Sequence, residues 1–424
     1  MFKDRGRLLR IMSGGIIAQA MLSATNFAVG LLLLRRTHED QYGYYVLVIT
    51  AIQLLTVLQN SYIAPPMVLR MTRTDQAGRA DLIGSLYRDQ RRLIPGVMIL
   101  TAGFAAALFF MGRLTLQETA IIAAATLAMF AALRREFMRV VVFSHHRPQD
   151  ILRADVFYCA LLITLTALAT LTPMAAAGAA VSLGLASLLG GTLLARRLWK
   201  FEPWNTRAPS GMLMAILPEG GWSAFGAGVH WLFNQGYTFL VAGAIDVKAV
   251  AALAATRLMI MPVTLLSSGI GTQLLPIVSR WTAHLRASAV LVRLTGLAFG
   301  VIGLASCYVA VMWLIRDWIF RTILHKDFTN RDTLLLLWCV ISLITVFRDQ
   351  LLYFLLSRAR FQTTSWLTAF CAVVSLSLSY YLLKRMGTVG ALIGLLSGEG
   401  INVVGIVAFS LLEARRAPDP VPTI

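Results

Sequence analysis

Long apolar runs alternate with short polar segments along the whole chain. Each run is close to the 20 or so residues that a helix needs to cross the hydrocarbon core of a bilayer. Because lipid offers no partners to backbone N–H and C=O groups, such runs predict helices. We therefore expect an all-α, polytopic membrane protein with twelve transmembrane helices. The predicted spans are residues 11–34, 42–65, 93–112, 118–142, 152–172, 176–195, 213–242, 248–277, 289–314, 332–356, 363–383 and 388–412.

Composition supports this expectation and narrows the class of partner. Of the 424 residues, 58% are hydrophobic and 14% are charged, whereas a soluble domain is roughly half apolar and about a quarter charged. The net charge of +18 would point to nucleic acid in a soluble protein, but here the basic residues lie between apolar runs. In that position Lys and Arg contact the headgroups of membrane lipids. We therefore expect membrane lipids, and no nucleic acid, as partners.

The distribution of Lys and Arg also orients the chain. With the amino terminus inside, most of these residues lie in segments on the cytoplasmic side, as the positive-inside rule requires. An even number of spans then returns the carboxyl terminus to the cytoplasm. Four basic residues in the loop at 315–331, expected outside, depart from the rule: Arg316, Arg321, Lys326 and Arg331.

No motif for metal, redox or nucleotide chemistry is visible. The four cysteines lie inside apolar runs without a CxxC spacing, so we expect small buried side chains rather than a metal or redox site. No Walker A pattern is present, which argues against ATP as the direct energy source. We therefore expect no cofactor and no catalytic residues.

Several residues recur at a nearly constant displacement, which predicts a duplicated chain. The longest match is displaced by 213 positions and pairs Arg135, Glu136, Ser144 and Arg147 with Arg348, Asp349, Ser357 and Arg360. Shorter matches pair Pro66 and Arg70 with Pro276 and Arg280, and Asn26 with Asn234. Parallel repeats of this kind build some transporters. With the polar linker at 196–211, the repeat predicts two six-helix lobes, 1–200 and 201–424.

Several passages resemble the oligosaccharide flippase branch of the multidrug/oligosaccharidyl-lipid/polysaccharide exporter superfamily, which includes O-antigen repeat-unit translocases. These passages are SGGIIAQAMLSATNF (13–27), RRTHEDQYGYYVLV (35–48), REFMRVVVFSHHRP (135–148), LPEGGWSAF (217–225) and ATRLMIMPVTLLSSGIGTQLLPIVSR (255–280). The similarity extends over nearly the whole chain but is diffuse, without one sharp signature.

This resemblance implies two lobes around a central cavity that opens alternately to each side of the membrane. It implies a polyprenyl-pyrophosphate-linked oligosaccharide as substrate, taken up at the cytoplasmic face for cell-surface polysaccharide biosynthesis. The bacterial cytoplasmic membrane is the location that it implies. It also implies a polysaccharide polymerase and glycosyltransferases of the same pathway as possible partners.

Arg257 is the strongest candidate for a binding residue. It lies inside the span at 248–277, about 13 Å along the helix, and a buried charge is a functional candidate by default. Its planar guanidinium suits a pyrophosphate; the alternatives are an ion pair between helices and a side chain that extends to the headgroups. Polar residues that would line a wet cavity, or bond between helices instead, are Asn26, Asn234, Gln235 and Gln273.

Two charged doublets, Arg135–Glu136 and Arg348–Asp349, lie near the inner ends of their spans. Because neighbours on a helix point about 100° apart, we expect each charge to find its partner on another helix. Gate, scaffold and substrate-contact roles all remain open for them. We interpret Arg134 and Arg139, which flank the first doublet, as headgroup anchors.

Two further acidic residues complete the candidates for gating or coupling. We expect Glu399, within LLSGEGINVV, to be a protonatable coupling residue, the partner of a buried arginine or a polar contact between helices. We expect Glu219, at the start of its helix, to be a first-turn or gate residue.

Three alternatives to a flippase fit the sequence less well. A multidrug antiporter of the same superfamily would need carboxylates and aromatic faces for an organic cation, whereas the first span has no acid and the deepest charge is Arg257. A membrane glycosyltransferase, polymerase or ligase would need a sizeable outward loop, and the outward loops are short. A structural membrane subunit leaves the charges inside spans unexplained.

Overall fold

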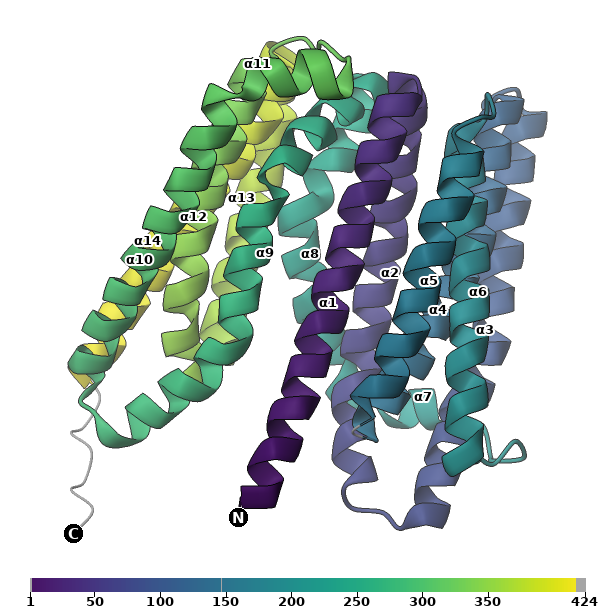
Figure 1. Ribbon diagram of the computed structural model, residues 1–424, viewed down its shortest axis with the longest axis vertical. Coiled ribbons are helices and arrows are strands. Elements are labelled where there is room, and N and C mark those ends of the chain that lie inside the picture. The colour runs from purple at the N-terminus through teal and green to yellow at the C-terminus, as the bar shows by residue number, and fades with distance from the viewer. Residues whose placement is uncertain (1, 146, 417–424) are drawn as a thin grey trace. The chain divides into compact units, whose positions relative to one another are not determined.

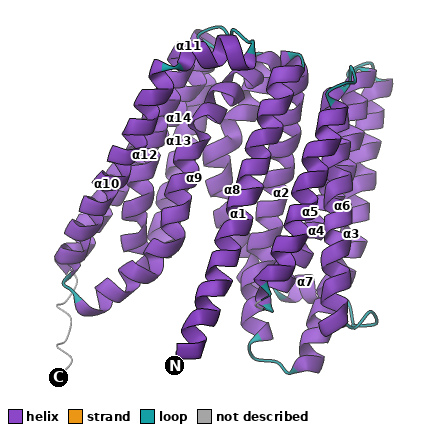
Figure 2. Ribbon diagram, in the orientation of Figure 1, coloured by secondary structure: helices purple, strands orange, loops and turns teal. Residues whose placement is uncertain are grey.

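The computed structural model describes residues 2–145 and 147–416, with side chains from residue 17 onward except 272, 273, 283 and 416. The described part is helical throughout, without strands (Figure 2). Its contacts form two compact units, one ending at Gly228 and the other beginning at Val229. The predicted lobes, 1–200 and 201–424, rest on the sequence repeat and remain a prediction.

The first unit contains seven helices and the start of an eighth (Figure 1). Within it α4 packs against α6, α2 and α3, while α5 packs against α6 and α1. The bounds are α1 Phe2–Arg36, α2 Glu39–Met71, α3 Gln76–Phe110, α4 Leu116–Ser144, α5 Pro148–Ala169, α6 Ala175–Phe201, the short α7 Met212–Ala215, and α8 Leu217–Ala244.

The second unit contains the rest of α8 and the remaining helices. Within it α12 packs against α9, α10 and α14, and α13 packs against α14. The bounds are α9 Val247–His284, α10 Ala287–Leu314, α11 Arg316–Trp318, the π-helical turn η1 Ile319–Leu324, α12 Arg331–Ser357, α13 Phe361–Met386 and α14 Thr388–Arg416.

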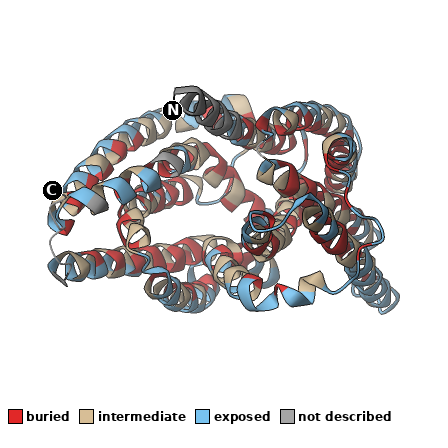
Figure 3. Ribbon diagram, turned by 90° about the horizontal axis from the view of Figure 1, so that it is seen from below, coloured by how far each residue is buried: buried red, intermediate tan, exposed pale blue. Residues whose placement is uncertain are grey.

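The twelve long helices follow the order of the predicted spans. Among the described residues, eleven helices are long and apolar enough to cross a membrane. The twelfth, α8, has 28 residues, but His230, Asn234 and Gln235 interrupt its apolar run. In each unit, buried residues lie where helices pack together (Figure 3), and many large apolar side chains are exposed. This pattern is typical of an all-α, multi-pass membrane protein.

The polar stretch between the predicted spans 42–65 and 93–112, which we expected to be a loop at about 70–92, is mostly helical, because α3 already begins at Gln76. Asp75 caps the helix by accepting a hydrogen bond from Gly78 N at 2.9 Å. The apolar residues of this polar stretch, Leu82, Ile83 and Leu86, pack into the core. Long apolar runs reveal only the part of a helix that faces lipid. They do not predict the first half of α3, whose apolar residues alternate with polar ones and face other helices.

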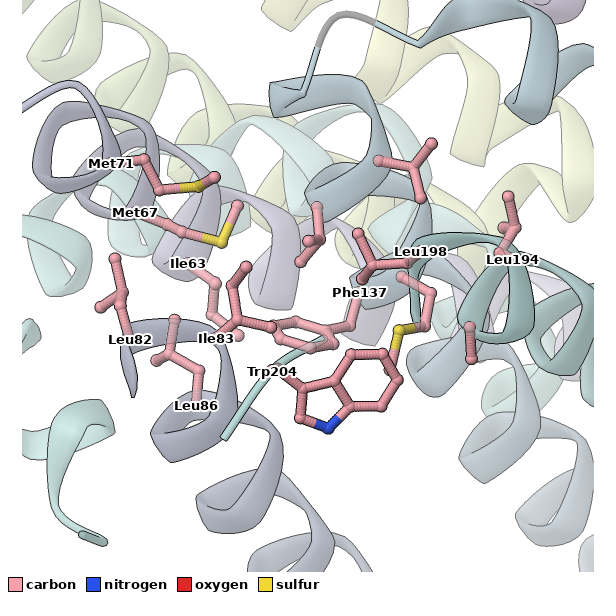
Figure 4. Close-up of a cluster of buried hydrophobic side chains, with 14 of the residues drawn as sticks. Ile63, Met67, Met71, Leu82, Ile83, Leu86, Phe137, Leu194, Leu198 and Trp204 are labelled. Carbon is pink, nitrogen blue, oxygen red and sulfur yellow. The ribbon is translucent and has the colours of Figure 1, made fainter. Parts of the chain in front are cut away.

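That core lies at one end of the first unit and also holds the linker after α6. Met67 of α2, Phe137 of α4, Leu198 of α6 and Trp204 of the linker are all buried in it (Figure 4). Asp89 of α3 accepts hydrogen bonds from the backbone N–H groups of Gly211 and Leu213, both at 3.0 Å. The linker is therefore a packed part of the first unit.

Two arginines of the loop at 315–331, which is predicted to lie outside, are paired with carboxylates. Arg331 Nη2 lies 2.6 Å from Asp317 Oδ1, and Arg316 Nε lies 3.3 Å from Asp332 Oδ2. These ion pairs do not explain the departure from the positive-inside rule, because acidic residues contribute little to that rule.

Three glycines spaced by four residues bring α14 close to α13. A Cβ at Gly390 would collide with the backbone of Leu382, one at Gly394 with the backbone of Ser379, and one at Gly398 with the side chain of Ser375. Small residues at every fourth position let two membrane helices approach closely, which increases their van der Waals contact.

We expect Gly394→Ala to lower the free energy of unfolding by about 1–3 kcal/mol, because the added methyl group overpacks the contact. The measurement is the midpoint of thermal unfolding in detergent micelles. Gly400→Ala is the matched control on the same helix, since nothing lies within 4 Å of a Cβ there. Equal midpoints for the two variants would contradict this account of the α13–α14 contact.

Candidate functional site

Arg257 lies at the centre of a cluster formed by α8, α9 and α12 within the second unit. It follows the first residue of α9 by ten positions, about 15 Å along the helix. Its Nη1 donates to Gln235 Oε1 at 2.6 Å and to the Tyr237 hydroxyl at 3.1 Å. Its guanidinium carbon lies 5.2 Å from the centre of the Trp338 ring. The arginine is thereby fixed by three side chains from two other helices.

The groups that hold Arg257 are all neutral. Trp338 is itself oriented by a hydrogen bond from its Nε1 to Leu253 O at 3.2 Å. Among the described residues no carboxylate lies within ion-pair distance of Arg257. The side chain is only partly buried, so the guanidinium keeps donors available. A fixed, uncompensated cation at this depth can bind an anion.

A second arginine of this unit, Arg348, is instead bound by carboxylates. Arg348 of α12 donates from Nη1 to Glu399 Oε2 of α14 at 2.5 Å and from Nη2 to Asp349 Oδ1 at 2.9 Å. The side chains of Arg348 and Glu399 are 5% and 1% exposed. Ser267 of α9 lies 3.4 Å from Asp349. This cluster therefore links three helices of the unit and leaves Arg348 fully compensated.

A similar cluster lies inside the first unit. Arg135 of α4 donates from Nη2 to Asp155 Oδ1 of α5 at 2.5 Å and from Nη1 to Glu136 Oε1 at 2.9 Å. Arg139 lies 3.2 Å from the other oxygen of Asp155. The Tyr158 ring stacks under Arg135 at 3.7 Å. Asp155 is completely buried, so two arginines neutralise its charge.

The expectation that the doublets do not pair with themselves is wrong. Arg135 bonds Glu136 and Arg348 bonds Asp349, because both long arginine side chains reach back along their own helix. The expectation of a partner on another helix is confirmed for the two arginines, through Asp155 and Glu399. Glu136 pairs only within α4 among the described residues, with Arg135 and Arg139.

The two units repeat the doublet but not the deep carboxylate. The position 213 residues before Glu399 is Ala186, and the position 213 residues after Asp155 is Thr368. The deep acid therefore comes from α5 in the first unit and from α14 in the second. Arg139 is not the expected headgroup anchor, because both of its ion pairs are internal.

The remaining predicted residues do not gather at one place. Asn234 donates to His230 O of its own helix at 2.8 Å rather than joining Gln235 at Arg257. Glu219, exposed at the start of α8, lies 3.6 Å from Arg70 of α2. Asn26 of α1 is partly buried and has no hydrogen bond in the described part of the chain. The side chain of Gln273 lies outside the described residues.

An amphipathic cleft adjoins the charge cluster of the first unit. It has a volume of about 680 Å³ and lies between α2 and α4. Glu136, Arg139 and Asn60 line its polar part, and Leu69 and Phe143 belong to its apolar wall. In the part of the chain that the structure describes, no group of three or more His, Cys, Asp or Glu residues has the arrangement of a metal site.

Comparison with known proteins places the fold. No model of a protein family matches the sequence, and no curated protein matches it. Solved structures do match: an inward-facing multidrug resistance MATE family transporter of the MOP superfamily aligns with a TM-score of 0.77 at 14% identity, covering 92% of this chain and 94% of the other. The chain has a MATE-like fold.

The lipid II flippase MurJ, in an inward closed conformation, is similar to nearly the same degree. It aligns with a TM-score of 0.76 at 12% identity and covers 93% of this chain and 87% of its own. An outward-facing MATE transporter aligns with a TM-score of 0.64 at 16% identity. At these identities the similarity to MATE transporters and MurJ shows the fold alone. Inference about the substrate therefore rests on the residues of the site.

Sequence reasoning missed three members of these clusters and misassigned a fourth. Tyr237 and Trp338 hold Arg257, but an aromatic residue in an apolar span gives no signal of its own. Asp155 was overlooked because it lies only three residues after the predicted start of its span, at 152. The presence of an acid beside apolar residues was the signal that could have found it. Arg139 was recognised but assigned to the headgroups.

Proposed function

We propose that the protein is a membrane transporter that flips an anionic, lipid-linked saccharide to the outer leaflet. The substrate class is a polyprenyl-pyrophosphate-linked oligosaccharide for cell-surface polysaccharide biosynthesis. The observation that carries the proposal is the difference between charges: Arg257 is held only by neutral groups, whereas the buried Asp155 and Glu399 are bound by arginines. The accessible deep charge is therefore a cation, which favours an anionic ligand.

In this mechanism Arg257 binds the pyrophosphate as alternating access moves the headgroup across. Arginine presents planar, paired donors that match phosphate oxygens. The polyprenyl tail remains in lipid, and Asn26, Asn234, Gln235 and Gln273 contribute polar contacts to the saccharide. A polysaccharide polymerase and glycosyltransferases of the same pathway are the proposed partners, in a bacterial cytoplasmic membrane with both termini inside.

The buried ion pairs have a different proposed role. The doublets Arg135–Glu136 and Arg348–Asp349, with Glu399, keep the helices of each unit together while the lobes move. Their described partners lie within a single unit, which supports a scaffold role over substrate contact. Glu219, exposed and paired with Arg70, is the better candidate for a gate.

A multidrug antiporter is the second candidate, favoured by the similarity to MATE transporters. Such a protein needs a free carboxylate for an organic cation. Deleting the gene in its host distinguishes the two functions. We expect a lipid-linked saccharide to accumulate on the cytoplasmic leaflet and the wild-type gene to reverse this. Absence of any such lipid, together with increased sensitivity to organic cations, would favour the antiporter.

A further inference from the structure

A second polar pocket lies between α3 and α4, within the first unit and apart from the cleft at Glu136. Its volume is about 330 Å³. Basic, amide and aromatic side chains line it, and no carboxylate does: Tyr87, Gln90, Arg91, Ile94, Phe130 and Arg134. The space is sufficient for a phosphate group with part of its ester.

Two buried donors of this pocket lack acceptors. Gln90 is 6% exposed, and its Nε2 has no hydrogen-bond partner; the Nε of Arg134 is likewise buried without a partner. Leaving a buried donor unsatisfied is unfavourable, and native structures seldom do so without a bound water, ion or ligand. The pocket therefore offers two buried donors to a hydrogen-bond acceptor from outside the chain.

Neighbouring arginines on the same two helices have partners within the chain. On α3, Arg88 donates to Thr206 O at 2.7 Å and Arg92 donates to Ser210 Oγ at 3.1 Å, so both hold the linker. Arg135, beside Arg134, binds Asp155. In the described part of the chain, neither Arg91 nor Arg134 has an ion pair of this kind. Two positive charges thus remain uncompensated around one pocket.

The surface next to the pocket is suited to acyl chains. Farther along α3, Val97 and Phe104 are exposed, and on α4 Leu127 is exposed. They continue the helix faces that line the pocket, since three or four residues make one turn. Basic pockets between membrane helices, next to lipid-facing apolar surface, recognise anionic headgroups. We propose that this pocket binds the phosphate of an anionic phospholipid, with the acyl chains along α3 and α4.

Thermal unfolding of the purified full-length protein in detergent tests the proposal. The probes are phosphatidylglycerol, phosphatidylcholine with the same acyl chains, and inorganic phosphate. We expect phosphatidylglycerol to raise the unfolding midpoint the most. Arg134→Ala and Gln90→Leu are expected to weaken its apparent affinity about tenfold or more, because charge-assisted and buried hydrogen bonds are lost.

Two controls separate specific binding from general attraction and from misfolding. Arg73→Ala removes an exposed charge just before α3 and is expected to leave the affinity unchanged. Gln90→Leu removes an unpartnered amide, so the midpoint without lipid is expected to stay near that of the wild type. Undiminished affinity in both pocket variants, or an equal shift with phosphatidylcholine, would overturn the proposal. A full shift with inorganic phosphate alone would assign the pocket to free phosphate instead.

Discussion

Arg257→Ala is expected to reduce transport of the lipid-linked saccharide about 10- to 100-fold while the protein still folds and reaches the membrane. A hydrogen bond to a charged group contributes about 1.5–3 kcal/mol, and each 1.4 kcal/mol is about a factor of ten. Its hydrogen-bond partners, Gln235 and Tyr237, are neutral. The substitution therefore leaves no buried charge without a partner. The measurement is rescue of the deletion strain at equal expression.

Arg257→Lys is expected to give intermediate rescue, because lysine keeps the charge but loses the planar paired donors. Arg385→Ala is the matched control. Arg385 also lies over an aromatic ring, 4.6 Å from the centre of Tyr381, but it is exposed at the end of α13. Full rescue by Arg257→Ala would show that Arg257 does not bind the substrate, even if the protein is a flippase.

Arg348→Leu is expected to lower the free energy of unfolding by about 3–5 kcal/mol, because Glu399 would become a buried charge without a partner. Arg348→Leu combined with Glu399→Leu is expected to lose much less, since a well-packed apolar pair can replace a buried ion pair. The measurement is unfolding of the purified variants by denaturing detergent in mixed micelles.

The exposed pair Arg360–Glu413 supplies the control for this prediction. Its atoms lie 2.9 Å apart, but Arg360 is 53% exposed, so Arg360→Leu is expected to cost only about 0–1 kcal/mol. If the two arginine variants lose equal stability, or if the double variant is as unstable as Arg348→Leu, Arg348 and Glu399 do not support each other in the way the geometry indicates.

The helices could be predicted from sequence because the bilayer fixes the length of an apolar run. The first half of α3 could not, since Leu82, Ile83 and Leu86 are buried by other helices and not by lipid. Arg257 was identifiable because a charge inside a span is rare. Its binding partners were only partly identifiable: Gln235 is a polar residue in an apolar run, whereas Tyr237 and Trp338 resemble ordinary membrane aromatics.

The ion-pair clusters required the fold. Arg348 and Glu399 are 51 positions apart, and the 213-residue repeat that links the doublets gives no counterpart for Glu399 or Asp155. The unpaired donors of Gln90 and Arg134 were invisible for the same reason: a side chain is known to lack a partner only when its neighbours are known. The substrate is not encoded by the fold either, because MATE transporters and MurJ share it.

Translocation by the purified protein in liposomes shows directly whether it moves a lipid-linked saccharide across a bilayer. A polyprenyl-pyrophosphate-linked saccharide is placed in the vesicles, and a lectin added outside reports how fast the saccharide of the inner leaflet becomes accessible. We expect faster exposure of the saccharide with the wild-type protein than in empty liposomes, and a loss of this effect with Arg257→Ala. The flippase proposal would be contradicted if exposure were no faster than in empty liposomes while the same protein accumulated an organic cation in these vesicles.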